Sequence, residues 1–266
     1  MIRAEDVFVV FYPNTPLERV ALRGVSLTIQ DGEIISLVGN NGSGRSTLLR
    51  FFAAHVSASV GRLWVDKTDI SCQTISERSL VFASVFYDEN IGTAGNLTVL
   101  ENLAIAGLHH QSRSVLAPAV SKEVRKSLLQ QLRDIDFMNM EVLADEKTAN
   151  ISKPHRQVLA MMIAVIKGAK ILLVDEHSTG LDKESAGALL RTTEKIVRSN
   201  NMTAIMAVGD LKFSIEASDR VVLLSHGKVV SDLKGEEKKK FKIDDIFATS
   251  ACDFSVSRHP QLPIPC

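Results

Sequence analysis

One short segment of the sequence combines glycines and hydroxyl side chains in a spacing that suits phosphate binding. The loop Gly39–Thr47 (GNNGSGRST) follows the apolar segment Ile34–Val38 and precedes a helical pattern. Glycines let a backbone approach a phosphate closely, and the free N–H groups at the beginning of a helix favour a negative charge. We therefore expect a phosphate-binding loop there. Its candidate binding residues are Gly39, Asn40, Asn41, Gly42, Ser43, Gly44, Arg45, Ser46 and Thr47.

Arg45 departs from the strict phosphate-loop pattern, which has a lysine at this position. Lysine is a compact point charge, whereas arginine is longer, planar and forked. The loop is therefore expected to bind phosphate with a changed position of the positive charge. The alternative interpretation is a glycine turn that only links a strand to a helix.

Two carboxylates end a second apolar segment. Asp175 and Glu176 follow Ile171 to Val174, a pattern typical of a buried strand. One acid at such a strand end can hold a magnesium-bound water, and the next can orient or deprotonate an attacking water. We predict that Asp175 and the loop hydroxyl of Ser46 are metal ligands and that Glu176 is catalytic. The alternative for the two acids is a helix cap.

The elements around these residues alternate between strand and helix patterns, which indicates an α/β fold with a mostly parallel sheet. Three β-branched segments, 7–11, 25–29 and 34–38, with a turn at Asp31-Gly32 between the last two, predict an antiparallel beginning. Further strands are expected at 62–65, 80–86, 171–174, 203–208, 220–224 and 229–233, and helices after positions 182 and 211.

The middle of the chain has a different pattern, because helical signals replace strands between Asn96 and Asn150. Thr98 to Glu101 form a capping box, and residues 122–137 carry apolar side chains at helical spacing. We predict a helical subdomain at about 96–150, inserted into a unit of residues 1–250. Residues 251–266 hold three of the seven prolines and are expected to be a flexible tail.

The composition narrows the possible partners and location. The 266 residues include 31 Lys+Arg and 31 Asp+Glu, so no overall field would attract nucleic acid, and we expect no nucleic-acid partner. The charged segment 234–242 is expected to be a solvated helix face. The apolar stretch 158–166 is too short for a bilayer, which needs about 20 residues. A cytoplasmic protein, or one held at a membrane through a partner, is the prediction.

The three cysteines are odd in number and show no CxxC spacing. This pattern predicts neither a disulfide framework nor a zinc site, and it favours a reducing compartment.

Taken together, the motifs resemble those of the ATP-binding cassette (ABC) ATPases of membrane transporters, over residues 1–245. Segment 97–103 (LTVLENL) is similar to the beginning of that family's helical subdomain, and 151–157 (ISKPHRQ) stands where its LSGGQ signature belongs. Segment 178–182 (STGLD) resembles its D-loop. The resemblance implies a P-loop NTPase core with an N-terminal antiparallel β subdomain, and a dimer in which each nucleotide lies between one chain's phosphate loop and the other's signature.

The same resemblance implies the function: an ATP-binding subunit that binds ATP and Mg²⁺ and drives a small-molecule permease from the cytoplasmic face of the membrane. The dimer can be a homodimer or a heterodimer. Tyr12 or Phe11 would stack on the adenine. Segments 11–15, 175–177 and 235–239 resemble a subgroup paired with small-molecule permeases, with amino-acid permeases as the narrower expectation.

Four motif positions differ from the family's pattern. They hold Arg45 for lysine, Tyr87 for glutamine, Lys153-Pro154-His155 for Gly-Gly-Gln and Gly209 for histidine. Each change removes or alters a contact to nucleotide, and losing one preorganised contact costs on the order of a hundredfold in rate. We therefore expect slow hydrolysis. The alternative is a pseudo-ATPase that acts as a structural or regulatory partner of a transporter.

Overall fold

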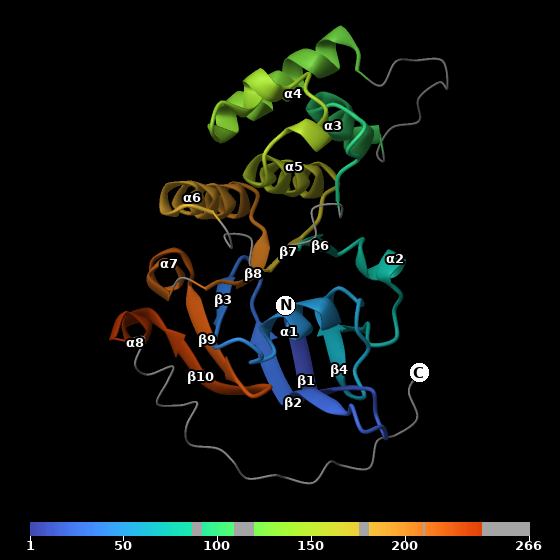
Figure 1. Cartoon of the computed structure of the whole chain (residues 1–266), viewed down its shortest axis with the longest axis vertical. Coiled ribbons are helices and arrows are strands. Elements are labelled where there is room, and N and C mark those ends of the chain that lie inside the picture. The colour runs from blue at the N-terminus through green and yellow to red at the C-terminus, as the bar shows by residue number, and fades with distance from the viewer. Residues whose placement is uncertain (87–91, 109–119, 176–180, 210, 241–266) are drawn as a thin grey trace.

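The computed structural model describes residues 1–86, 92–108, 120–175, 181–209 and 211–240, which form two sheets and an arm of helices (Figure 1). A four-stranded antiparallel sheet has the order β2-β1-β4-β5, and a six-stranded sheet has the order β10-β9-β3-β8-β7-β6. The strands of the first sheet are β1 Ile2–Phe11, β2 Arg19–Ile29, β4 Val60–Val65 and β5 Thr68–Asp69. The strands of the second are β3 Ile34–Val38, β6 Phe82–Val85, β7 Ile171–Asp175, β8 Thr203–Ala207, β9 Arg220–Ser225 and β10 Lys228–Lys234.

The helices lie between, beside and beyond the sheets (Figure 1). They are α1 Arg45–Phe52, α2 Ile75–Arg78, α3 Val99–Leu108, α4 Lys122–Ile135, α5 Lys153–Ile166, α6 Lys183–Ser199, α7 Leu211–Ala217 and α8 Gly235–Lys240, with short 3₁₀ turns η1 Met140–Leu143 and η2 Thr148–Asn150. In these ranges of the chain, no helix is long and apolar enough to cross a membrane. Helix α8 buries none of its residues, which agrees with the solvated face expected for the charged segment.

The predicted antiparallel beginning is correct for two of its three strands. β1 pairs antiparallel with β2, with Ile2 opposite Ile29. β3 does not continue this sheet, because it pairs parallel with β8 and β9 in the other one. All five residues of β3 are buried, as a strand needs when both faces of its sheet are covered, whereas β2 alternates. The turn after β2 therefore connects two sheets and is not a hairpin.

The six-stranded sheet is mostly parallel, as predicted, with β10 alone antiparallel to its neighbour among the described strands. Its two faces are covered by different elements. Ile35 and Leu37 point into a cluster with α1 and the antiparallel sheet, and Ile34 into a cluster with α5 and α6. Because parallel strands end at one edge of the sheet, the loops after β3 and β7 come close together there.

The arm consists of α3, α4 and α5 (Figure 1, top). The predicted capping box at the beginning of α3 is present: the Thr98 hydroxyl accepts a hydrogen bond from Glu101 N at 3.1 Å, and Glu101 Oε2 accepts one from Thr98 N at 2.8 Å. Leu128 and Leu132 of α4 are buried, which agrees with the helical spacing of that segment. The arm thus packs through the apolar faces that the sequence shows.

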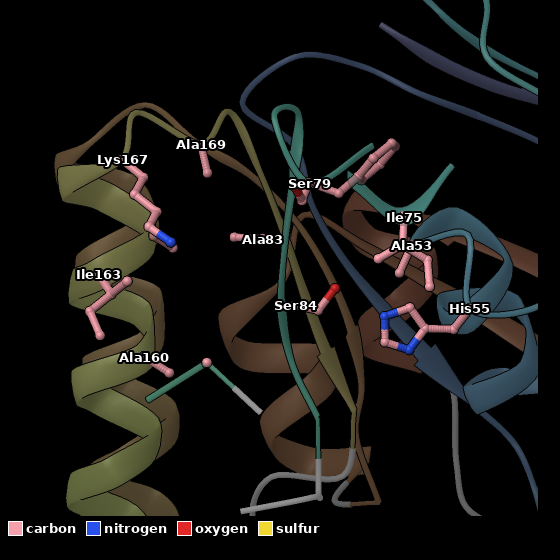
Figure 2. A pocket seen from close by; sticks show the side chains of 13 residues that line it. Ala53, His55, Ile75, Ser79, Ala83, Ser84, Ala160, Ile163, Lys167 and Ala169 are labelled. Atoms are coloured by element: carbon pink, nitrogen blue, oxygen red, sulfur yellow. The ribbon is translucent and has the colours of Figure 1, made fainter. Parts of the chain in front are cut away.

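A groove of about 240 Å³ separates the arm from the core (Figure 2). Ala160 and Ile163 of α5 line one side of it, and Ala53 and His55, after α1, line the other. Strand β6 lies between them. The groove is lined mostly by small side chains.

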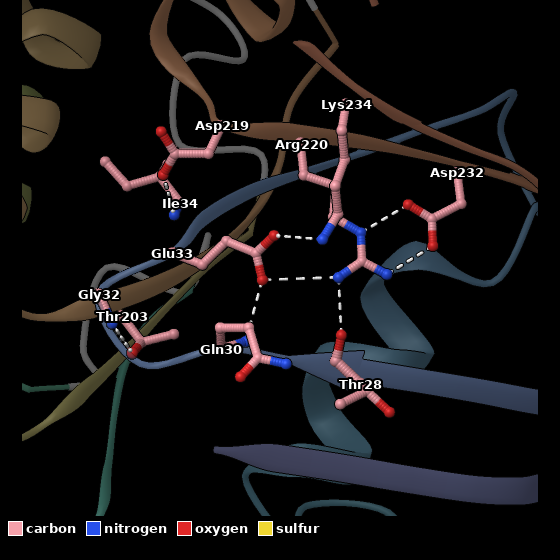
Figure 3. Close-up of polar contacts among 10 residues, drawn as sticks. All are labelled: Thr28, Gln30, Gly32, Glu33, Ile34, Thr203, Asp219, Arg220, Asp232 and Lys234. Carbon is pink, nitrogen blue, oxygen red and sulfur yellow. Dashed lines mark hydrogen bonds and ion pairs between the residues drawn. The ribbon is translucent and has the colours of Figure 1, made fainter.

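A buried polar network holds β9 and β10 against the end of β2 (Figure 3). Arg220 donates to both carboxylate oxygens of Asp232 and, at 2.6 Å, to the carbonyl oxygen of Thr28. Its Nη1 lies 3.5 Å from Glu33 Oε2, and both of these side chains are at most 10% exposed. Asp232 holds the pKa of Arg220 above its ordinary value through hydrogen bonds and charge, although burial acts against it. The network joins the open end of the β9–β10 hairpin to the connection between β2 and β3.

One cysteine departs from its prediction, because Cys72 is disulfide-bonded in the structure.

Candidate functional site

The glycine loop leaves β3 and enters α1 in a backbone shape that only glycine accepts easily. Gly39, Gly42 and Gly44 have φ values of +151°, +80° and +106°. A Cβ on Gly39 would collide with the carbonyl oxygen of Leu224, and one on Gly44 would lie 2.9 Å from the carbonyl oxygen of Ala21. The glycines are therefore required both by the turn and by the close approach of neighbouring strands.

Neighbouring segments hold the loop in place. The amide of Ser43 donates to Asn40 O at 3.0 Å within the loop, and Ser43 O accepts a hydrogen bond from Gly227 N at 2.9 Å. Gly227 lies in the β9–β10 turn, and its own carbonyl accepts from Arg23 N of β2 at 2.8 Å. The loop is thus fastened to both sheets before any ligand binds.

The loop encloses a polar pocket of about 360 Å³. Its lining consists of Arg19, Ala21, Asn40, Asn41, Gly42, Ser43, Gly44, Arg45, Ser46 and Thr47. The structure therefore brings together eight of the nine residues expected in this loop. Gly39 does not line the pocket but makes the turn out of β3. Arg19 was not predicted to line this pocket, because a basic residue at the beginning of a strand does not by itself indicate a binding site.

Ser46 and Asp175 meet at the carboxyl edge of the parallel sheet. The Ser46 hydroxyl donates a hydrogen bond to Asp175 Oδ1 at 2.9 Å, and Asp175 is only 5% exposed. A hydroxyl and a carboxylate beside a phosphate pocket are hard oxygen donors of the kind Mg²⁺ prefers. This donor pair and the crowded glycines fit a bound magnesium nucleotide. Glu176, the predicted catalytic residue, lies outside the described residues, as do Tyr87 and His177.

Comparison with known proteins agrees with this geometry. The family described as ABC transporter matches residues 22–179, which is more than half of the chain. The chain belongs to the ABC transporter family. Within it, the chain is an ATP-binding subunit and an ABC-type ATPase.

Individual relatives of this ABC ATPase support the assignment. It is 32% identical to a tyrosine transport ATP-binding protein of Clostridioides difficile over 88% of this chain and 90% of that protein. It is 27% identical to a phosphonates import ATP-binding protein of Nostoc sp. over 92% of both chains.

Solved structures show the same fold. A dimeric ATP-binding cassette in a post-hydrolysis state, bound to ADP and Pi, superposes with a TM-score of 0.72 at 22% identity, over 88% of this chain and 98% of that one. An ADP-bound cassette of an ABC transporter gives a TM-score of 0.73 at 21% identity, over 93% and 98%. The predicted P-loop NTPase fold is confirmed.

Arg45 takes a position that sequence reasoning did not foresee. Arg45 is only 7% exposed, and its Nη1 donates a hydrogen bond to the carbonyl oxygen of Val208 at 3.3 Å. Val208 follows β8 and precedes Gly209, where the family pattern has histidine. A Cβ on Gly209 would meet nothing within 4 Å. The guanidinium of Arg45 therefore reaches toward the strand end from which the histidine side chain is missing.

The signature segment forms the beginning of α5 in this ABC ATPase. Ser152 occupies the N-cap position and Pro154 the first turn. Proline has no N–H to offer a phosphate. The Ser152 hydroxyl does not cap the helix backbone but bonds to the imidazole of His155. The segment is thus a regular helix beginning with an unusual side-chain contact.

Two further predicted residues have separate positions. Tyr12 is 66% exposed with a φ of +52° and is not among the residues that line the loop pocket, so its stacking on adenine stays a prediction. Asp182, the last residue of the D-loop-like segment, caps α6 by accepting a hydrogen bond from Ser185 N at 2.9 Å. This backbone hydrogen bond holds the pKa of Asp182 below its ordinary value. Residues 178–180 lie outside the described part of the chain.

Proposed function

We propose that this ABC ATPase binds Mg-ATP in the loop pocket and hydrolyses it slowly to drive a small-molecule permease. The observation that carries the proposal is the 2.9 Å hydrogen bond between Ser46 and Asp175 beside a pocket lined by the glycine loop. The beginning of α1 and the end of β7, which are far apart in the sequence, supply two oxygen ligands for a magnesium ion. The matched relatives, whose names describe ATP-binding transport proteins, lend no support to the pseudo-ATPase alternative.

The residues divide the chemistry among them. The loop amides and Arg45 would hold the phosphates, and Ser46 and Asp175 would hold Mg²⁺. Bound magnesium supplies charge stabilisation at the phosphate oxygens. Glu176, directly after Asp175, would orient the attacking water and accept its proton. Tyr12 or Phe11 would stack on the adenine.

Slow turnover follows from the altered contacts. Arg45 donates one hydrogen bond to the carbonyl oxygen of Val208, and Pro154 has no backbone N–H at the signature segment. In a dimer each site would combine one chain's loop with the partner's signature, so a homodimer of this chain would be impaired on both sides of each site.

The same proposal includes organisation and location. We expect residues 1–250 to form the nucleotide-binding unit, with the helical insert at about 96–150 and a tail at 251–266. The chain would work as a homodimer or heterodimer, held at the cytoplasmic face of the membrane by its permease. The relative that transports tyrosine favours an amino-acid permease as the partner.

The groove of Figure 2 is the surface we assign to the permease. It lies between core and arm, and Ile75, a 52% exposed apolar residue, lines it. A permease segment seated there would touch both parts at once. In cells of the native host, Ile75→Glu should release the protein from the membrane fraction, whereas Val142→Glu, at an exposed residue that does not line the groove, should leave it bound. Equal distribution of the two variants would contradict the assignment.

Phosphate release from ATP tests the activity. The purified chain should release phosphate at a slow, saturable rate, and Glu176→Gln should abolish that rate. Ser199→Ala, at an exposed position outside the site, is the matched control and should leave the rate unchanged. Phosphate release that persists in Glu176→Gln would contradict the proposed role of Glu176.

A further inference from the structure

His155 joins two neutral groups at the beginning of α5. Its Nδ1 lies 2.6 Å from the Ser152 hydroxyl oxygen, and its Nε2 lies 3.2 Å from the carbonyl oxygen of Met138. The ring packs edge-on against Phe137, and the residue is only 8% exposed. Both ring nitrogens therefore have a fixed partner.

The Met138 carbonyl decides which nitrogen carries the proton. A carbonyl oxygen can only accept, so Nε2 must donate and must carry a hydrogen. A neutral imidazole has one N–H, which leaves Nδ1 with a lone pair. The Ser152 hydroxyl must then donate its single hydrogen to Nδ1.

The direction of this hydrogen bond matters because Ser152 is exposed at the beginning of α5. With its hydrogen engaged by His155, the hydroxyl presents only lone pairs to an incoming group. Lone pairs repel a phosphate oxygen. When His155 carries a second proton, Nδ1 becomes the donor, Ser152 accepts, and the hydroxyl hydrogen is free to point outward.

We propose that His155 is a positioning residue that sets the direction of the Ser152 hydroxyl. Neutral His155 withholds the hydrogen from an anionic ligand, and doubly protonated His155 releases it. The ligand would be the terminal phosphate of a nucleotide held by the partner subunit of a dimer, and this identification rests on the proposed function. The family pattern has glutamine at this position, and its amide does not change charge with pH.

Charged residues adjoin the two ends of this contact in the sequence. Lys153 and Arg156 lie on α5 itself, Asp136 follows α4, and Glu141 lies in η1. The two groups bonded to the ring, Ser152 and Met138 O, are neutral.

Nitrogen NMR of the ligand-free protein tests the tautomer without reference to ATP. At pH 8 the His155 ring, assigned by its absence in His155→Gln, should show the pattern of a neutral imidazole protonated at Nε2. Ser152→Ala should keep that tautomer, because the Met138 contact remains. A ring protonated at Nδ1 in the wild-type protein would overturn the proposal.

ATP turnover between pH 6 and pH 8 tests the consequence. Relative to His155→Gln, the wild-type rate should rise about tenfold from pH 8 to pH 6, the amount expected for one hydrogen bond to a charged group. Ser152→Ala should lose this rise although His155 is intact, which a merely structural role of His155 would not produce. Equal pH profiles in the three proteins would overturn the inference while leaving the ATPase standing. Absence of turnover in all three would refute the proposed function, with the NMR result still deciding the tautomer.

Discussion

Arg45 illustrates how one residue can alter a motif without destroying it. It occupies the first position of α1, where the positive end of the helix favours anions, but its guanidinium is buried against the carbonyl of Val208. Arg45 thus lines the loop pocket and also contacts the backbone at the end of β8. The geometry explains why binding and turnover should respond differently when the side chain is changed.

Two variants at this position separate binding from turnover. Arg45→Ala should weaken Mg-ATP binding by about tenfold or more, because a charge-assisted hydrogen bond is lost. Arg45→Lys should keep binding and raise turnover, because lysine places a point charge at the phosphates. Calorimetry and phosphate release measure the two effects, with Arg125→Ala as a control at an exposed arginine of α4. Unchanged binding in Arg45→Ala would contradict a phosphate contact for Arg45.

At the scale of elements, the Arg220 network should contribute more to stability than a similar pair on the surface. Arg220→Ala would remove the hydrogen bonds to Asp232 and Thr28 O and leave the buried Glu33 carboxylate with Lys234 as its cation, and breaking such a partly buried network should cost about 3 kcal/mol. Arg125 also donates to both carboxylate oxygens of an aspartate, Asp145, but this pair is exposed to solvent, so Arg125→Ala should lower the free energy of unfolding clearly less. Urea unfolding of the two variants measures the free energies. Equal losses would show that the network does not fasten β9 and β10 as described.

Asp219 predicts how acid affects the connection between β3 and α6. Burial alone would raise the pKa of its carboxyl, but the hydrogen bonds from Arg198 and from Ile34 N, together with the charge of Arg198, lower it below the ordinary value. Because the pKa of Asp219 is lower in the folded state than in the unfolded state, its ionised carboxylate stabilises the fold. This stabilisation is complete above the unfolded-state pKa, near 4, and is lost as the pH falls through the folded-state pKa. The free energy of unfolding of Asp219→Asn should therefore depend less on pH below 4 than that of the wild type. Parallel pH profiles would contradict this role.

The elements also show what the sequence could predict. The glycine spacing predicted a phosphate-binding loop, and the apolar segments before Gly39 and Asp175 predicted two buried strands; the structure brings Ser46 of this loop to Asp175. The sheet of β3 was mispredicted, because a two-residue turn signal cannot tell a hairpin from a connection between sheets.

Contacts between distant segments remained outside sequence reasoning. Neither the Arg45 contact with Val208 nor the Arg220 network has a local signal, since each depends on how β8 or β9 lies beside β3. The His155 contact with Met138 likewise requires the segment after α4 to fold back on α5. Residue types could be read from the sequence, but the direction of their hydrogen bonds could not.

At the scale of the whole molecule, the altered signature should lower ATP turnover by a dimer more than it affects ATP binding by a single chain. Lys153→Gly with Pro154→Gly restores a backbone N–H and removes a long side chain where the family's backbone comes close to nucleotide. The double variant should therefore raise turnover at saturating ATP, while binding to the isolated chain's own loop stays unchanged. Phosphate release and calorimetry measure the two quantities. Unchanged turnover would show that the signature is not what limits hydrolysis.

The proposed function depends most directly on whether the loop pocket binds a magnesium nucleotide. Calorimetric titration of the purified chain with Mg-ATP, beside the same titration of Ser46→Ala, measures this. We predict saturable binding with one site per chain, and a Ser46→Ala affinity for Mg-ATP that falls to the wild-type affinity for ATP with magnesium chelated. No binding by the wild-type chain at millimolar Mg-ATP, or equal affinity in the two proteins, would contradict the assignment of Ser46 and the loop as the magnesium nucleotide site.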